Sequence, residues 1–170
     1  QEGFYEAAGR ARERHGADRI GVFIGTSTAG VLHTELAYRQ RDRNAHRLPD
    51  WFQHRYTQST HSPAEFVATA LNLQGPVVAI STACSSSAKV FASAARAIEA
   101  GLCDAAVVGG IDSLCLTTLH GFNSLQLVSG DICRPADAQR SGISIGEAAG
   151  YALLERPQGV ASALLLGYGE

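Results

Sequence analysis

Two short apolar runs on either side of an alanine-rich stretch constrain the fold more than any other feature of this sequence. The runs "PVVAI" (76–80) and "DAAVVGG" (104–110) are continuous and rich in valine, a pattern typical of strands buried on both faces. Between them, apolar residues from Val90 to Ile98 recur at helical spacing, and Gly101 ends the pattern. The segment therefore predicts a β-α-β unit within a parallel sheet.

Helical and strand patterns alternate along the rest of the chain. The predicted elements are a helix over 2–15 closed by Gly16, a strand over 19–25, helices over 31–41 and 62–73, and, beyond 111, a helix, a turn-rich link and two or three strands with at least one antiparallel pair. The helix at 62 begins with "SPAE", in which Ser62 acts as the N-cap and Glu65 completes a capping box. Residues 1–170 therefore predict one α/β domain, or part of one, with a mixed, mainly parallel sheet.

Composition limits the class of protein. With 45% hydrophobic and 18% charged residues in 170, the chain is typical of a globular domain that buries roughly 70% of its unfolded surface. Its formal net charge of -2 provides no basic field to attract nucleic acid. The sequence shows no signal peptide, no membrane-length apolar run and no Cys-x-x-Cys pair, so we expect a cytoplasmic protein with reduced thiols. It begins at Gln1 and contains no methionine, which suggests a piece of a longer protein.

Cys84 lies in "STACSSSA" (81–88), at the strand-to-helix turn of the predicted β-α-β unit. A cysteine in the first turn of a helix is close to unpaired amides and to the positive end of the helix dipole, which both favour a thiolate. The same amides are suited to bind a developing oxyanion, and Ser85, Ser86 and Ser87 leave the approach to the thiol open. The alternative is that Cys84 is only a small buried residue, as free cysteines often are. Position alone leaves both interpretations open.

Four motifs in a fixed order carry a family resemblance. "STACSSSA", "AAVVGGID", "GFNSLQLVS" and "RPADAQRSGISIGEAAGYALLE" resemble the N-terminal half of a β-ketoacyl-acyl carrier protein synthase, a condensing enzyme of the thiolase superfamily. The resemblance covers roughly 20–170 and implies a thiolase-like layered α/β fold. "TACSSS" is typical of polyketide ketosynthases, while "RPADAQRSG" is closer to the fatty-acid elongating synthases.

The resemblance implies roles for three residues. Cys84 matches the acyl-accepting nucleophile, and Phe122 matches a position that lines the acyl pocket. A basic docking residue for the acidic carrier protein falls near "HRLPDWF", which indicates Arg47, although a solvated arginine-rich face explains this stretch equally well. Gln126 stands where related enzymes often have another arginine. The family's two catalytic histidines and its lysine belong to C-terminal motifs that do not occur in these residues.

The implied reaction is decarboxylative condensation in fatty acid or polyketide chain elongation. Cys84 takes an acyl group from a phosphopantetheine thioester, and a malonyl group on acyl carrier protein then loses carbon dioxide and attacks the acyl-enzyme. No cofactor is expected beyond the phosphopantetheine of the carrier. The resemblance implies a homodimer, with a heterodimer as the alternative, and an isolated 170-residue fragment is expected to be inactive in condensation. Acyl chain length and primer are left open.

Other functions fit the sequence less well. A non-catalytic chain-length partner of a ketosynthase heterodimer usually lacks the nucleophile, and a thiolase or an acyl-CoA-primed synthase does not match "RPADAQRSGISIGEAAG". A cysteine hydrolase with His120 as its base lacks the hydrolase signatures. His46, His54 and His61 are seven or eight residues apart, which is not a zinc-ligand spacing, so no metal is expected. No nucleotide-binding glycine loop is present, and Gly109 and Gly110 are predicted to end a strand and to allow close backbone packing.

Overall fold

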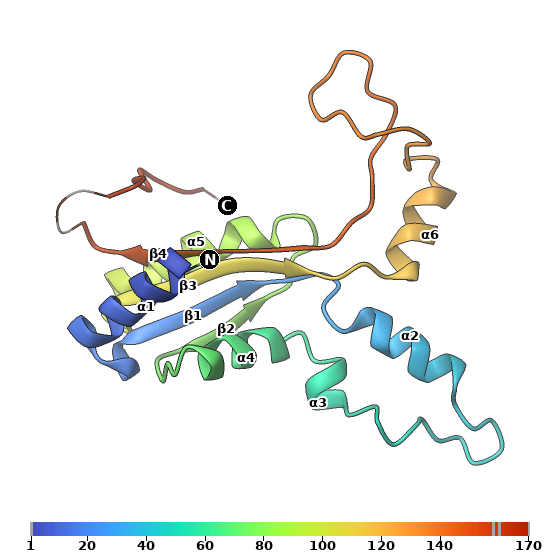
Figure 1. Cartoon of the computed structure of the whole chain (residues 1–170), viewed down its shortest axis with the longest axis horizontal. Helices are drawn as coiled ribbons and strands as arrows, with labels where there is room; N and C mark the ends of the chain where they lie inside the picture. The colour runs from blue at the N-terminus through green and yellow to red at the C-terminus, as the bar shows by residue number, and fades with distance from the viewer. Residues whose placement is uncertain (1, 158, 160, 170) are drawn as a thin grey trace. The chain divides into compact units, whose positions relative to one another are not determined.

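A four-stranded sheet with the order β2-β1-β3-β4 forms the centre of the fold (Figure 1). The computed structural model describes residues 2–157, 159 and 161–169. The strands are β1 (Ile20–Gly25), β2 (Val77–Ile80), β3 (Ala105–Asp112) and β4 (Ala148–Glu155). The helices are α1 (Glu2–His15), α2 (Val31–Arg39), α3 (His54–Thr57), α4 (Ser62–Ala70), α5 (Ser86–Glu99) and α6 (Leu116–Ser124), with a short 3-10 helix at Ala17–Arg19.

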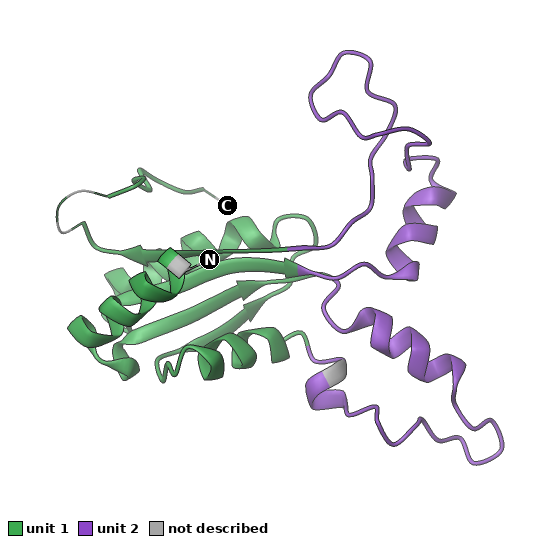
Figure 2. Cartoon of the chain, viewed as in Figure 1, with its two compact units in different colours: residues 1–27, 60–111, 149–170 green, residues 28–59, 112–148 purple. Residues whose placement is uncertain are grey.

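The chain divides into two compact units (Figure 2). Unit 1 comprises 1–27, 60–111 and 149–170 and holds most of the sheet together with α1, α4 and α5. Unit 2 comprises 28–59 and 112–148 and holds α2, α3 and α6. The strand β2, the helix α5 and nearly all of β3 therefore lie in unit 1.

Strand β1 lies between the two strands of the predicted β-α-β unit. It pairs in parallel with β2, where Val22 is opposite Val77, and in parallel with β3, where Val22 is opposite Val107. The chain that leaves β2 therefore passes through α5 and crosses β1 before it enters β3. The predicted unit and the parallel pairing are confirmed. Strand β4, next to β3, runs in the opposite direction (Figure 1), which makes the sheet mixed, as predicted.

Both faces of the sheet are covered by helices in unit 1. Val22 and Ile24 of β1 pack in one cluster with Ala64 and Val67 of α4, whereas Phe23 packs in a second cluster with residues of α5. Successive side chains of a strand point to opposite faces, so these two clusters lie on the two sides of the sheet. All six residues of β1 are buried for this reason.

The strands β2 and β3, which the sequence predicted to be equally buried, differ in their burial. The first five residues of β3 are buried, as expected. Strand β2 is only half-buried along its whole length, because it lies at the edge of the sheet. The prediction that 76–80 is buried on both faces is therefore wrong for this strand.

Element boundaries agree with the predictions to within a few residues, with two exceptions. Helix α4 begins at Ser62 and its N-cap is His61, one residue before the N-cap that the sequence predicted. Within the described residues, β4 is the one strand that follows α6, and 161–169 contains none, so the prediction of two or three strands was too high. Gly16 and Gly101 both have positive φ, at 88° and 75°, where they follow α1 and α5 as predicted.

Candidate active site

Cys84 lies in the turn between β2 and α5, as the sequence predicted. Ser85 is the N-cap of α5, so Cys84 stands just before the helix, whereas we had expected it in the first turn. The preceding residue, Ala83, has a positive φ of 54°, a conformation that residues with a Cβ adopt rarely. The Cys84 side chain is exposed, which rules out the interpretation of a small buried residue within this chain.

Ser86 holds this turn in place from inside the protein. Its side chain is only 3% exposed. Its hydroxyl donates a hydrogen bond to the carbonyl of Ala83 at 2.7 Å and accepts one from the amide of Thr82 at 2.9 Å. The hydroxyl of Ser85 donates to the carbonyl of Thr82, also at 2.9 Å. Two of the three serines therefore brace the backbone around Cys84, a role that the sequence did not predict.

The first amides of the turn are also used within it. The amide of Ser85 donates to the carbonyl of Thr82 at 3.4 Å, and the amide of Ser86 donates to that of Ala83 at 3.1 Å. These two amides were among those expected to bind an oxyanion. Since each of these two amides already has an acceptor within the turn, both stabilise the conformation of the turn.

Two glycines let α5 begin directly against the sheet. A Cβ on Gly25, the last residue of β1, would lie 2.4 Å from the carbonyl carbon of Ser86 and 2.6 Å from the amide nitrogen of Ser87. A Cβ on Gly110 would lie 2.5 Å from the Cβ of Ser87. Real Cβ atoms do not approach so closely, so both positions require glycine.

Gly109 and Gly110 serve the close packing that the sequence predicted. A Cβ on Gly109 would lie 2.4 Å from the carbonyl oxygen of Gly150 in β4. However, both glycines lie within β3 and do not end it, so that part of the prediction was wrong. Glycine usually weakens the interior of a strand, but at these two positions the missing side chain leaves room for a neighbouring segment to pack against the backbone.

The four cysteines, all in the described part of the chain, differ in their surroundings. Cys103 lies in the segment just before β3 and is fully buried, and burial raises the pKa of its thiol. Cys115 is also buried and is the N-cap of α6. Neither Cys103 nor Cys115 lies in a strand. Cys133 is half-buried, and its thiol donates to the carbonyl of Gly142 at 3.9 Å. Among these four, Cys84 is the exposed one.

We therefore expect alkylation to select Cys84. Brief treatment of the folded, full-length protein with iodoacetamide should modify Cys84 first, because a reagent must reach the sulfur and Cys103 and Cys115 are covered. Peptide mass spectrometry over a time course gives the order of labelling. Cys133 serves as the internal control because it is half-buried, and its earlier modification would contradict the assignment.

Removal of the buried Ser86 hydroxyl is expected to destabilise the turn. Ser86→Ala leaves the amide of Thr82 without the acceptor at 2.9 Å, and unfolding free energy should fall by about 1–3 kcal/mol. Ser87→Ala is the matched control, because it removes an exposed hydroxyl and keeps the Cβ that faces Gly110, so a change below about 0.5 kcal/mol is expected. Urea denaturation measures both. Equal effects of the two variants would contradict the role of Ser86.

Phe122 and Arg47 belong to unit 2, whereas Cys84 belongs to unit 1. Phe122 lies on α6 and is half-buried. Arg47 lies in a hairpin over 40–51, where its backbone pairs with that of Asp42 and its guanidinium forms an exposed ion pair with Asp50 at 3.0 Å. These two residues are thus found in separate parts of unit 2, on a helix and on a hairpin.

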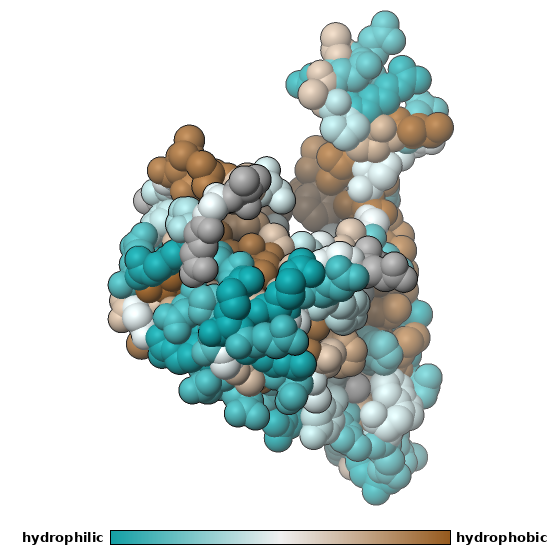
Figure 3. Space-filling view, turned by 60° about the vertical axis from the view of Figure 1, so that its left-hand side comes forward, coloured by the Kyte–Doolittle hydropathy of each residue, from teal (hydrophilic) through white to brown (hydrophobic). Residues whose placement is uncertain are grey.

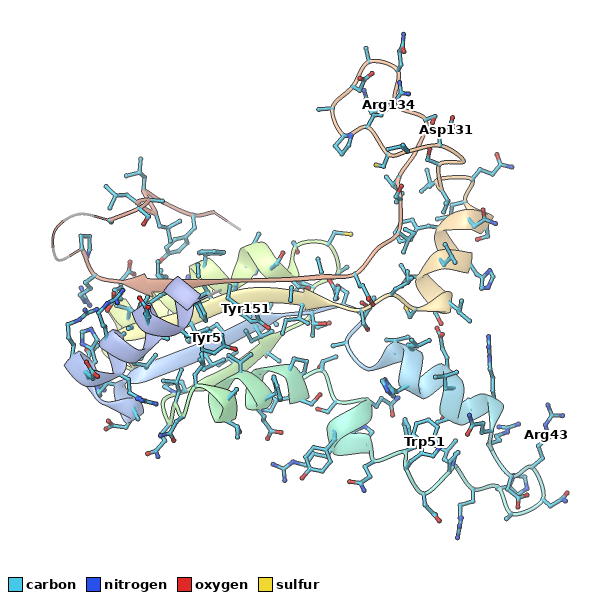
Figure 4. All side chains as sticks on the ribbon, viewed as in Figure 1. Tyr5, Arg43, Trp51, Asp131, Arg134 and Tyr151 are labelled. Atoms are coloured by element: carbon cyan, nitrogen blue, oxygen red, sulfur yellow. The ribbon has the colours of Figure 1, made fainter. Side chains whose placement is uncertain are left out.

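The hairpin has the exposed, arginine-bearing surface that the sequence predicted. Its side chains line an open hollow formed by Gln40, Asp42, Ala45, Arg47, Leu48, Pro49 and Trp51. Trp51 is partly exposed and donates to the side-chain oxygen of Gln40 at 3.3 Å, and Arg43 lies at the tip of the hairpin (Figure 4). This geometry suits a docking face and a solvated face equally, so the role of Arg47 stays a prediction.

The histidines that the sequence analysis considered do not gather into a site. His120 lies on the exposed side of α6 in unit 2. In residues 2–157, 159 and 161–169, no group of three His, Cys, Asp or Glu side chains is close enough to hold a metal ion. No helix in the same residues is long and apolar enough to cross a membrane.

One residue of unit 2 that the sequence analysis missed contacts the start of α6. The carboxylate of Glu35, on α2, accepts hydrogen bonds from the amides of Leu116 and Thr117 at 3.1 and 2.7 Å. These partners lie 81 and 82 residues away along the chain, and no local pattern in α2 indicates them.

Fold and site together define an α/β protein in which a mixed, mainly parallel sheet presents an exposed thiol at a strand-to-helix turn. Residues 3–159 match the family described as "Beta-ketoacyl synthase, N-terminal domain", and the chain belongs to this family. The resemblance drawn from the four sequence motifs is thereby confirmed, and the fold is thiolase-like.

Relatives of known name agree with this assignment. Nodulation protein E of Rhizobium meliloti is 34% identical over 149 residues, which are 87% of this chain and 37% of that protein. The protein named 3-oxoacyl-[acyl-carrier-protein] synthase 2, from Rhizobium meliloti strain 1021, is 32% identical over 144 residues, 79% of this chain and 34% of that protein. The chain therefore spans well under half the length of the curated relatives it matches.

Solved structures with the same fold are also ketosynthases. A chain from the solved complex of the ketosynthase ApeO with its chain length factor ApeC, from Xenorhabdus doucetiae, superposes with a TM-score of 0.72 and 38% identity over 90% of this chain and 39% of that chain. A beta-ketoacyl synthase from Burkholderia phymatum gives a TM-score of 0.66 and 25% identity over 82% of this chain and 36% of that chain.

Proposed function

We propose that this chain carries the nucleophile of a β-ketoacyl-acyl carrier protein synthase that elongates fatty-acid-like or polyketide-like chains. The observation that carries the proposal is the exposed thiol of Cys84, braced by buried Ser86 at the end of a parallel strand in a member of this family. Substrates arrive as phosphopantetheine thioesters on an acyl carrier protein, and the proposed reaction needs no resident cofactor.

The proposed reaction has two steps. The thiolate of Cys84 attacks the carbonyl of the acyl thioester, a new thioester forms on Cys84, and the phosphopantetheine thiolate leaves and takes up a proton. The malonyl group on the carrier then loses carbon dioxide, and the carbanion that remains attacks the acyl-Cys84 carbonyl. The Cys84 thiolate is expelled, and the β-ketoacyl product stays on the carrier. The family's histidines, which the resemblance places in motifs outside these 170 residues, would stabilise the enolate in the second step.

The test separates the two steps. Full-length protein is incubated with an acyl-carrier thioester, with and without malonyl-carrier, and mass spectrometry follows acyl-Cys84 and the β-ketoacyl product separately. We expect acyl-Cys84 to accumulate without malonyl-carrier and to be consumed when malonyl-carrier is added. An acyl group found on Cys133, or product without any acyl-Cys84, would overturn the proposal.

The 170-residue chain alone is expected to form no β-ketoacyl product. Loss of one electrostatic donor to a developing oxyanion typically lowers the rate by about 100- to 1,000-fold, so loss of the whole set leaves no measurable turnover. Product formed by this chain alone would mean that the base lies within these residues, and His120 would be the first to replace.

An alternative is that the chain belongs to a non-catalytic chain-length partner. The solved ketosynthase ApeO is in complex with a chain length factor, so related proteins include an assembly of two different chains. A partner without a catalytic role would form no acyl-Cys84 in the experiment above. The exposed thiol of Cys84 favours the catalytic role.

We also propose that the full-length protein is a dimer, with a second copy or with a related partner, formed through the edge of the sheet at β2. This strand ends the sheet order and is half-buried. Phe66 of α4, a helix that packs against β2, is 72% exposed, and Figure 3 shows apolar patches on the face that it draws. An obligate interface would bury more than about 2,000 Å² in total. Sedimentation at micromolar concentration should give a dimer, and a stable monomer would contradict the proposal.

A further inference from the structure

Helix α6 begins without a side-chain cap of its own. Its N-cap, Cys115, makes no capping hydrogen bond, and the sulfur lies 3.0 Å from the hydroxyl of Thr118. The first amides of a helix need acceptors, which an N-cap side chain such as Ser or Asp usually provides. A cysteine is a weak acceptor, so the cap must come from elsewhere.

Glu35 of α2 supplies that cap. One carboxylate oxygen accepts from the amide of Thr117 at 2.7 Å and from its hydroxyl at 2.6 Å. The other oxygen accepts from the amide of Leu116 at 3.1 Å. The hydroxyl of Thr117, followed by the two amides, holds the pKa of the Glu35 carboxyl below its usual value. A negative charge at this end also interacts favourably with the helix dipole.

The hydrogen bonds to Glu35 are important for the orientation of α6 because the helix is short and poorly buried. It has only nine residues, a length at which isolated helices are marginal, and none of its residues is fully buried. Three hydrogen bonds from Leu116 and Thr117 to one carboxylate hold its first turn. A change at Glu35 should therefore move the whole helix.

Phe122 is on the part of α6 that such a movement would displace most. It lies on the same side of the helix as Thr118 and Leu119, since residues three and four apart share a face, and all three side chains are half-buried. At about 1.5 Å per residue, Phe122 is about 9 Å along the axis from Leu116, so a small tilt at the first turn becomes a larger displacement there.

We propose that Glu35 is a positioning residue for the acyl pocket, which acts by holding α6 and hence Phe122 in place. The inference rests on the proposed function and on the role that the family resemblance implies for Phe122, which is to line the pocket that receives the acyl chain. Glu35 contacts no substrate in this proposal. Its loss should change the preference among acyl chains, since the pocket wall shifts while the nucleophile is untouched.

The experiment measures acyl-chain preference in the full-length protein. The readout is the ratio of kcat/KM for acylation of Cys84 by hexanoyl and by dodecanoyl pantetheine thioesters. Glu35→Ala should shift this ratio about tenfold, which corresponds to a change of about 1.4 kcal/mol in the difference between the two transition-state free energies. Glu35→Gln keeps one amide oxygen as acceptor and should recover part of the wild-type ratio. Glu13→Ala, an exposed acid on α1, is the matched control and should change nothing.

A double-mutant cycle tests whether Glu35 acts through Phe122. Phe122→Ala should itself shift the ratio, and in that background Glu35→Ala should add less than about a twofold further change. If Glu35→Ala fails to fold, Thr117→Val removes the hydroxyl donor at 2.6 Å and should shift the ratio in the same direction by a smaller factor.

The outcomes separate this inference from the proposed function. No acyl-Cys84 in the wild-type protein would overturn the proposed function. Acyl-Cys84 with an unchanged ratio in Glu35→Ala, or with equal losses for both thioesters, would overturn the positioning role alone. Additive effects of Glu35→Ala and Phe122→Ala would also overturn it, because the two residues would then act independently.

Discussion

Replacement of Cys84 by alanine in the full-length protein is expected to abolish both acyl transfer and condensation. The exposed thiol is the proposed point of attachment of the acyl group, and alanine carries no nucleophile. Loss of a covalent nucleophile lowers turnover by roughly a thousandfold or more in enzymes that depend on one. Mass spectrometry of the protein after incubation with an acyl-carrier thioester, together with an assay of β-ketoacyl product, measures both steps.

Cys133→Ala is the matched control for this substitution. It removes a half-buried thiol that donates one long hydrogen bond, so acylation should persist with little change. Folding of each variant is checked by circular dichroism. If Cys84→Ala kept more than about a tenth of the wild-type turnover, a different residue would have to carry the acyl group, and the proposed function would be wrong.

Replacement of Gly25 by alanine is expected to destabilise unit 1 by about 3 kcal/mol. The new Cβ would lie 2.4–2.6 Å from the backbone of Ser86 and Ser87, which cannot rotate away as a flexible side chain would. Relief of that contact requires α5 to move off the sheet, which would also displace the turn that holds Cys84, because this turn leads directly into α5. We therefore expect a lower urea midpoint and an altered rate of Cys84 alkylation in the same variant.

Gly9→Ala controls for the effect of an added methyl group. Gly9 lies within α1, and a Cβ there would meet nothing within 4 Å. Alanine favours the helix over glycine, so this variant should be more stable by about 0.5–1 kcal/mol. A Gly25→Ala protein as stable as wild type, measured beside Gly9→Ala, would show that α5 is not held against β1 as closely as the structure indicates.

The sequence predicted the components of the site to different extents. The position of Cys84 was predictable because an apolar run, a cluster of small residues and a helical stripe follow one another within one short segment. The bracing role of Ser86 was not, since a serine in such a cluster has the same local signal whether its hydroxyl is buried or exposed. Glu35 was missed entirely, because its carboxylate acts on a helix 81 or 82 residues further along the chain.

The sequence by itself determined the β-α-β unit, the turn that holds Cys84 and the family, because each depends on patterns of neighbouring residues. Only the tertiary structure decided that β1 is central and β2 is at the edge, although "PVVAI" is as apolar as the run that forms β3. It also decided that Gly25 and Gly110 must lack side chains and that Glu35 caps α6. Burial, close approach and capping depend on which distant segments become neighbours, and the type of a residue does not specify its neighbours in space.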